Sequence, residues 1–108
     1  MNDTPIQISP TELKTLLDQK KSFILLDVRE PEEWKIANIG GILIPLHEIT
    51  QRYEELDPQS EIVVLCHHGI RSAQATAFLR SQGYHRARNL SGGIDRWSCE
   101  VDPKIPRY

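Results

Sequence analysis

The chain alternates between short apolar runs and segments in which apolar residues recur every three or four positions. Ile62–Leu65 and residues 23–28 are runs of branched and aromatic residues, typical of strands that are buried on both faces of a parallel sheet. After the first of these runs, the apolar spacing predicts a helix that begins near Ser72 and stops at Gly83. The pattern therefore predicts a strand, a tight polar loop and a helix in the middle of the chain.

The first strand and the first helix are marked by their boundary residues. Ile6 and Ile8 alternate with polar neighbours, which favours a short strand. Ser9 and Glu12 have the spacing of a capping box, and Pro10 takes the first helical position. We expect the buried stripe of this helix to consist of Leu13, Leu16 and Leu17.

Five further elements follow from the same kinds of pattern. A short acidic helix begins at Pro31, residues 42–44 form a strand, and a longer helix occupies residues 46–56 before a proline. Residues 86–90 are predicted to form an exposed edge strand, because arginines alternate with smaller residues there. The turn at residues 91–93 then leads into a last short helix.

Three further residues are expected to pack in the interior of the protein. Trp34, Ala37 and Trp97 are predicted core residues, the last of them one helical turn after Ile94. The C-terminal segment, residues 102–108, contains two prolines and is predicted to lie on the protein as an extended strap.

The loop after the strand at Ile62–Leu65 opens with a cysteine. Amides of such a loop and of the following helical turn lack intrahelical acceptors, so an anion is favoured in front of them. A thiol at a helix start or beside a cation ionises more readily than a free thiol. The helix dipole supplies only about 0.3 to 1 kcal/mol, so Arg71, with His67 and His68 when protonated, would have to help stabilise a Cys66 thiolate. Gly69 would let the loop curl around the sulfur.

Packing offers a second interpretation of Cys66, since free cysteines are among the most buried residues. The sequence His-His-Gly-Ile-Arg that follows is too polar for a core crossing. It also follows a central strand at its carboxyl end, where open α/β sheets bind ligands. We therefore favour a functional cysteine.

Three motifs, LLDVREPEEW, CHHGIRS and NLSGGIDRW, occur in the order and spacing of the rhodanese (sulfurtransferase) family, which the chain resembles from about Ser9 to Trp97. The resemblance implies an α/β fold, with a mostly parallel five-stranded sheet and helices on both faces. The whole chain, residues 1–108, would be one domain with its active loop at residues 66–72. In such a domain Cys66 would be catalytic and would carry a sulfane sulfur as a persulfide.

The resemblance also indicates the reaction and the site. Cys66 would take sulfur from a small anionic donor such as thiosulfate and pass it to cyanide, a thiol or a sulfur-carrier protein, with no cofactor. Similar C-terminal tails end the rhodanese domains of sulfur-activating enzymes. The substrate-binding residues are expected to be His67, His68, Gly69, Ile70, Arg71 and Ser72.

A carboxylate lies within the second buried strand. Asp27 should be paired there, because an unpaired buried charge costs several kcal/mol. Arg29 and Arg71 are the candidate partners, and loop amides are an alternative. We expect Asp27 and Arg29 to support the loop without contacting Cys66, since a carboxylate against the sulfur would disfavour a thiolate. Sequence alone leaves open whether Arg71 faces the substrate or Asp27.

Charge and cysteine content limit the other classes of function. A net charge of −2 with thirteen scattered Lys and Arg residues argues against a nucleic-acid-binding protein. Cys66 and Cys99 lack the spacing of a metal site, so we expect no metal and a reducing compartment. Without an apolar leader or span, the sequence predicts a cytoplasmic protein that does not enter a membrane. Cys99 could act as a resolving thiol, although no spacing supports that role.

The sequence departs from the family at one motif and leaves two rival functions open. Where the family usually shows Gly-His-Ile-x-Gly-Ala, this chain has Ala37, Asn38 and Ile42 at three of the positions.

A phosphatase or arsenate reductase would need five residues between cysteine and arginine, whereas four separate Cys66 from Arg71. A non-catalytic binding or regulatory module of the same fold is the other alternative.

Overall fold

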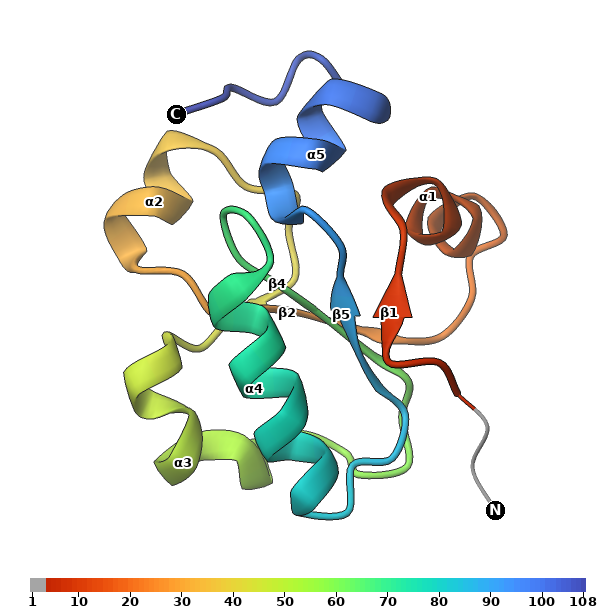
Figure 1. Ribbon diagram of the computed structural model, residues 1–108, viewed down its shortest axis with the longest axis vertical. Coiled ribbons are helices and arrows are strands. Elements are labelled where there is room, and N and C mark those ends of the chain that lie inside the picture. Colours follow the sequence, from red (N-terminus) through yellow and green to blue (C-terminus); the bar gives the residue numbers. More distant parts are fainter. Residues whose placement is uncertain (1–3) are drawn as a thin grey trace.

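The computed structural model describes residues 4–108, which form a five-stranded sheet with helices on both faces (Figure 1). The strand order is β1-β5-β4-β2-β3, and all four strand pairs are parallel. The strands are β1 (Gln7–Ile8), β2 (Ile24–Asp27), β3 (Ile42–Leu43), β4 (Ile62–Leu65) and β5 (Ala87–Leu90). The helices are α1 (Pro10–Asp18), α2 (Pro31–Ile36), α3 (Ile49–Arg52), α4 (Ile70–Ser81) and α5 (Gly93–Glu100), with 3₁₀ turns η1 (Leu46–Glu48) and η2 (Tyr53–Glu55) beside α3.

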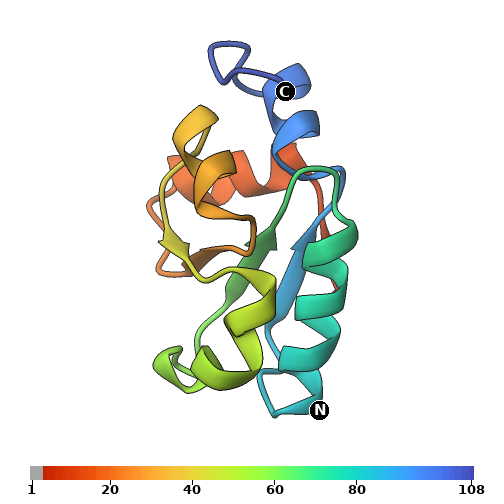
Figure 2. The ribbon, with the colours of Figure 1, turned by 90° about the vertical axis from the view of Figure 1, so that its left-hand side faces the viewer.

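The helices divide into two layers, one on each face of the sheet. Helices α3 and α4 cover one face, and α1 and α5 cover the other (Figures 1 and 2). Each face has its own apolar cluster: Leu26, Val64 and Leu79 belong to the first, and Leu25 and Val63 to the second. Neighbouring residues of β2 and β4 thus face opposite clusters, which is why both strands are apolar throughout.

The expected start of α1 is confirmed in detail. The amide of Glu12 donates to Ser9 Oγ at 3.1 Å, and the amide of Ser9 donates to Glu12 Oε1 at 2.9 Å. Leu13 is fully buried as predicted, but Leu17 is 41 % exposed. The apolar stripe of α1 is therefore narrower than the sequence suggested: Leu16 packs against the core, whereas Leu17 faces solvent.

Residues 86–90 contain a strand as predicted, β5 (Ala87–Leu90), but its expected position at an exposed edge of the sheet is wrong. Strand β5 lies between β4 and β1, and Ala87 and Leu90 are fully buried. The guanidinium of Arg88 donates to the carbonyl groups of Pro5 and Gln7, so this arginine lies along the first strand instead of projecting into water. The edges of the sheet are β1 and β3, each only two residues long.

Other boundaries also differ from the sequence expectation. The helix expected at residues 46–56 is divided into η1, α3 and η2, and the segment at residues 23–28 contributes only Ile24–Asp27 to the sheet. Trp34 is only partly buried, whereas Ala37 and Trp97 are buried. The tail is non-helical, as the prolines predicted, with turns at residues 101 and 103–105 before its extended end.

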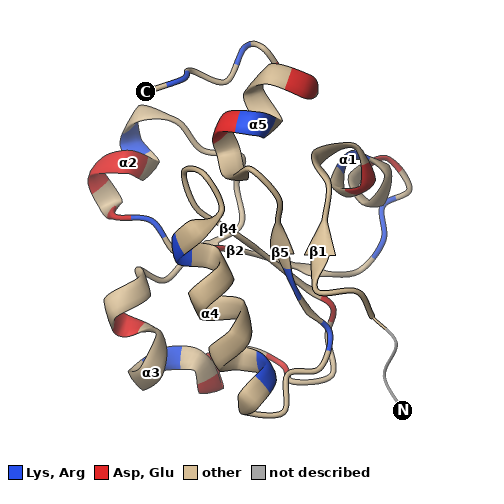
Figure 3. Ribbon diagram, in the orientation of Figure 1, with Lys and Arg blue, Asp and Glu red and all other residues tan. Residues whose placement is uncertain are grey.

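Charged residues are spread over the surface, with Lys and Arg interspersed among Asp and Glu on several helices (Figure 3). Within residues 4–108, no helix combines the length and the apolar character needed to cross a membrane.

Candidate active site

Three segments surround one loop at the carboxyl ends of the strands. The loop between β4 and α4 lies beside α2, the start of α5 and the C-terminal tail (Figure 1). Gly69 has φ +99°, a left-handed conformation that bends the chain into α4. The helix accordingly begins at Ile70, two residues before the expected Ser72. This tight bend directs the amides of the loop toward Cys66.

Cys66 is 1 % exposed, and its sulfur is held by loop amides. The amide of Gly69 donates to Cys66 Sγ at 3.1 Å, and the amide of Ser72 donates to it at 3.3 Å. Ser72 Oγ lies 3.2 Å from the same sulfur. Donors aimed at sulfur favour a negatively charged atom at this position.

A polar residue that the sequence reasoning missed lies behind Ser72. The buried Asn89 accepts a hydrogen bond from the Ser72 hydroxyl through Oδ1, while its Nδ2 donates to the carbonyl of Gly69 and to Gln7 Oε1, both at 3.2 Å. Two acceptors around Nδ2 fix the orientation of the Asn89 amide. Asn89 thereby connects the strand β5 to both sides of the cysteine loop.

The glycine turn before α5 packs directly on the loop. The amide of Ile94 donates to the carbonyl of Cys66 at 2.9 Å, and the amide of Asp95 donates to the carbonyl of His67 at 3.1 Å. Gly93 has φ +62°, and a Cβ there would collide with both of those carbonyl groups. Only glycine allows α5 to approach the loop this closely.

Asp27 and Arg29 form a fully buried ion pair beneath the loop. Arg29 Nη2 donates to Asp27 Oδ2 at 2.7 Å, Nε donates to Oδ1 at 2.9 Å, and the Arg29 amide also donates to Oδ1 at 3.0 Å. A further bond from Arg29 Nη2 reaches the carbonyl of Ala37 at 2.7 Å. Of the two arginines considered for Asp27, Arg29 is therefore the partner.

Arg71 binds a residue that sequence reasoning did not consider. Its Nη1 and Nη2 donate to the two carboxylate oxygens of Glu33 on α2, at 2.6 and 2.8 Å. The Arg71 hydrogen bonds, followed by those from Tyr108 and the Glu30 amide, lower the pKa of Glu33 to about 2 despite its partial burial. The same pair raises the pKa of Arg71. Glu33 lies 38 positions before Arg71, so no local signal in the sequence links the two residues.

The two loop histidines are in different environments. His67 is stacked between His68 and Tyr108, with ring centroids 4.0 and 3.9 Å away. Burial, followed by the proximity of His68, lowers the pKa of His67. His67 is therefore a weaker source of positive charge than the sequence suggested. His68 is exposed, with Nδ1 3.9 Å from Asp95 Oδ2.

Comparison with known proteins identifies the architecture around this loop. The family model described as "Rhodanese-like domain" matches residues 9–100. The chain belongs to the rhodanese-like family. This agrees with the resemblance seen from Ser9 to Trp97 and with the parallel α/β fold.

Individual relatives support the same assignment. The rhodanese-like chain is 38 % identical to YrkF of Bacillus subtilis, a protein named as a sulfur carrier, over 89 % of this chain and 52 % of YrkF. It is 32 % identical to the adenylyltransferase and sulfurtransferase UBA4 of Candida albicans, over 98 % of this chain and 26 % of UBA4. The chain thus spans about half or less of the length of these curated relatives.

A solved structure matches over nearly its whole length. The human single-domain sulfurtransferase TSTD1 superposes with a TM-score of 0.79 at 30 % identity, covering 89 % of this chain and 97 % of TSTD1. Membership of this family, together with these names, supports sulfur transfer as the general chemistry of the rhodanese-like fold seen here.

The remaining predicted site residue, Ile70, lies at the surface of the rhodanese-like domain. It is 72 % exposed at the start of α4, next to the loop. Among the described residues, no group of three or more His, Cys, Asp or Glu side chains is placed to hold a metal ion.

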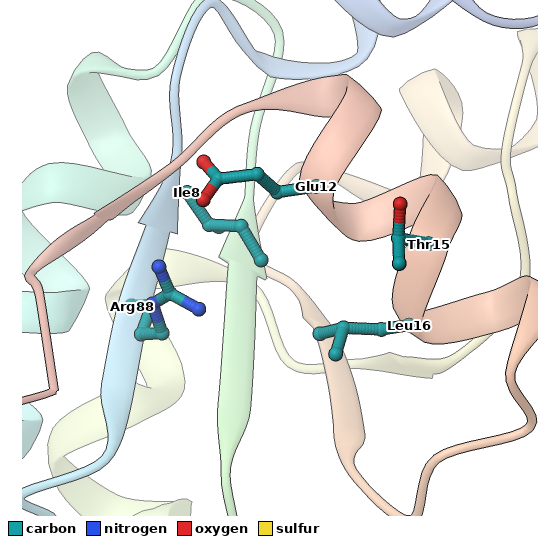
Figure 4. A pocket seen from close by; sticks show the side chains of 5 residues that line it. All are labelled: Ile8, Glu12, Thr15, Leu16 and Arg88. Atoms are coloured by element: carbon teal, nitrogen blue, oxygen red, sulfur yellow. The ribbon is translucent and has the colours of Figure 1, made fainter.

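A separate pocket opens between α1 and strands β1 and β5 (Figure 4). Its lining includes Glu12 and Arg88, but Glu12 caps α1 and Arg88 donates to Glu61 and to backbone carbonyls. The pocket contains neither a cysteine nor a histidine. Cys66 belongs to the apolar cluster on the α4 face of the sheet, so the pocket is not part of its site.

Proposed function

We propose that this rhodanese-like domain is a sulfurtransferase in which Cys66 carries the transferred sulfur as a persulfide. The observation that carries the proposal is the position of Cys66 Sγ, which receives hydrogen bonds from the amides of Gly69 and Ser72. Such donors stabilise negative charge on Sγ, both in the thiolate that attacks the donor and in the thiolate that forms again when the sulfur leaves.

The first half-reaction loads the cysteine. The Cys66 thiolate attacks the outer sulfur of a donor such as thiosulfate, forming a new S–S bond. The sulfur–sulfur bond of thiosulfate breaks, its electron pair leaves with sulfite, and the Cys66 persulfide anion remains. No oxidant or reductant is needed, because the two S–S bonds exchange one for one.

The second half-reaction returns the thiolate. A nucleophile attacks the outer sulfur of the persulfide, and the electron pair of the S–S bond returns to Cys66 Sγ. Cyanide would leave as thiocyanate, and a thiol would leave as a new persulfide. The sulfur-related names of YrkF and UBA4 support a sulfur-carrier protein as a further class of acceptor.

Intact-mass measurement tests the cysteine directly. The protein is treated with thiosulfate, and its mass is recorded with and without reductant, beside Cys66→Ala and Cys99→Ala. We expect wild type and Cys99→Ala to gain one sulfur atom that reductant removes, whereas Cys66→Ala gains none. Cys99→Ala is the matched control because Cys99 is the exposed thiol of the chain.

Two results would reject the proposal. A sulfur gain that persists in Cys66→Ala and disappears in Cys99→Ala would assign the chemistry to the wrong thiol. Failure of the wild type to gain sulfur from thiosulfate or from another sulfane donor would favour a binding module that uses the fold without catalysis.

A further inference from the structure

Glu33 is a charged residue beside the Cys66 loop that the proposed reaction does not use. Its carboxylate accepts both Nη donors of Arg71, at 2.6 and 2.8 Å, in a bidentate pair. The Glu33 side chain is only 18 % exposed, and that of Arg71 is 34 % exposed. Such a pair is strong in both geometry and charge, so the arginine nearest to the Cys66 loop is already neutralised.

Glu33 is fixed in this position from two further directions. The hydroxyl of Tyr108 donates to Glu33 Oε2 at 2.7 Å, and the amide of Glu30 donates to Glu33 Oε1 at 3.1 Å. Burial, together with the hydrogen bond to Glu33, outweighs nearby Arg29 and raises the pKa of Tyr108 to about 12, so the hydroxyl keeps its proton at neutral pH. Two hydrogen-bond donors besides Arg71 therefore hold the carboxylate in place against Arg71.

The other arginines around the loop are paired in the same way. Arg29 binds Asp27 below the loop, and Arg107 Nε donates to Asp95 at 2.8 Å beside it. The surroundings of the Cys66 loop thus offer hydrogen-bond donors, but the positive charge of each of these arginines is balanced by a carboxylate. A dianion gains its advantage over a monoanion from net positive charge, which this arrangement removes.

We propose that Glu33 sets the sulfur-donor specificity of the Cys66 site, favouring singly charged donors such as thiosulfonates and thiol persulfides over the thiosulfate dianion. The inference rests on the proposed sulfur transfer through Cys66. Arg71 keeps a role, because its Nε and outer Nη protons have no partner among residues 4–108 and remain available to an oxygen of the donor.

The test compares two sulfur donors that differ in charge and share a leaving-group chemistry. Thiosulfate releases sulfite and methanethiosulfonate releases methanesulfinate, and both leave one sulfur on Cys66. The measured quantity is the ratio of kcat/KM for thiosulfate to kcat/KM for methanethiosulfonate. Intrinsic differences in reactivity cancel when this ratio is compared between variants.

Removing the charge of Glu33 should change this ratio in favour of the dianion. We expect Glu33→Gln to raise it by at least about tenfold, which corresponds to ~1.4 kcal/mol. The double variant Glu33→Gln/Arg71→Gln should return the ratio to within about threefold of wild type, because the uncompensated arginine is then gone. Glu32→Gln removes the same charge from an exposed neighbour on α2, and should leave the ratio within about twofold.

An unchanged ratio in an active Glu33→Gln enzyme overturns the inference. If Glu33→Gln loses transfer from both donors, the inference is tested on the wild type instead, by measuring how the ratio of the two kcat/KM values depends on salt concentration. Between about 0.01 and 1 M salt, where the screening length falls from about 30 to about 3 Å, we expect its ratio to change by less than about threefold. A larger fall would indicate a net positive site and also overturn the inference. Wild type that takes sulfur from neither donor instead contradicts the proposed function.

Discussion

The ring of Tyr108 stacks on the imidazole of His67, with centroids 3.9 Å apart and planes inclined by 10°. The Tyr108 hydroxyl accepts a hydrogen bond from Arg29 Nη1 at 2.9 Å and donates to Glu33. Within the described chain, His67 Nε2 is buried without a hydrogen-bond partner. The C-terminal tail therefore helps to determine the environment of the cysteine loop.

Removing the Tyr108 ring should change the titration of His67. Burial is the main cause of the lowered His67 pKa, so Tyr108→Ala, which exposes the imidazole, should raise that pKa toward its ordinary value of 6.5. Tyr108→Phe keeps the stacked ring and should leave the His67 pKa nearly unchanged. An NMR pH titration of the His67 ring protons measures both variants. An unaltered His67 pKa in Tyr108→Ala would show that the tail does not bury this residue in solution.

Glu33 should make the free energy of unfolding depend on pH in the acid range. Its pKa falls from 4.5 to about 2 on folding, mainly through Arg71. The stabilisation is fully present above pH 4.5 and is lost as the pH falls toward 2. Its size is on the order of 3 kcal/mol at most.

Urea unfolding of wild type and Glu33→Gln at a series of pH values isolates this contribution. We expect wild type to be the more stable near neutral pH, and the difference to shrink toward zero as the pH approaches 2. Other carboxylates titrate alike in both proteins and cancel. A stability difference that stays constant over this range would show that Glu33 titrates normally in the folded state.

The buried pair of Asp27 and Arg29 should be costly to break from one side. Arg29→Met leaves the Asp27 carboxylate buried without its partner, and should reduce the free energy of unfolding by about 3 to 5 kcal/mol. Arg52→Met removes an exposed arginine that is paired with Glu48 and Glu55, and should cost less than about 1 kcal/mol. Denaturant titration gives both values. Equal losses in the two variants would contradict a special role for burial.

The close approach of α5 to the cysteine loop should depend on Gly93. Gly93→Ala adds a Cβ that collides with the carbonyl groups of Cys66 and His67, so we expect lower stability and loss of sulfur loading. Gly83→Ala is the matched control, since Gly83 also has a positive φ, +95°, but a Cβ there meets nothing within 4 Å. It should cost about 1 kcal/mol and leave loading intact. Full loading of Gly93→Ala would show that the loop tolerates displacement of the turn.

Much of the fold could be predicted because it depends on residues close together in the sequence. The continuous apolar runs located β2 and β4, and the Ser9 and Glu12 spacing located the start of α1. The place of Cys66 after a buried strand followed from the same runs. The strand β5 was also predicted, but its burial was not, because that burial depends on pairing with β1, about eighty positions earlier.

The sequence by itself determined the class of fold, the family and the place of Cys66 at the end of a buried strand, since each is encoded in local apolar patterns and short motifs. Tertiary structure alone decided which charges neutralise one another around that cysteine. Arg71 had several carboxylates available, and its pairing with Glu33 depends on how α2 and α4 meet at the carboxyl edge of the sheet. Long-range ion pairs between flexible side chains leave no periodic signal in the sequence, because only the folded backbone brings their ends together.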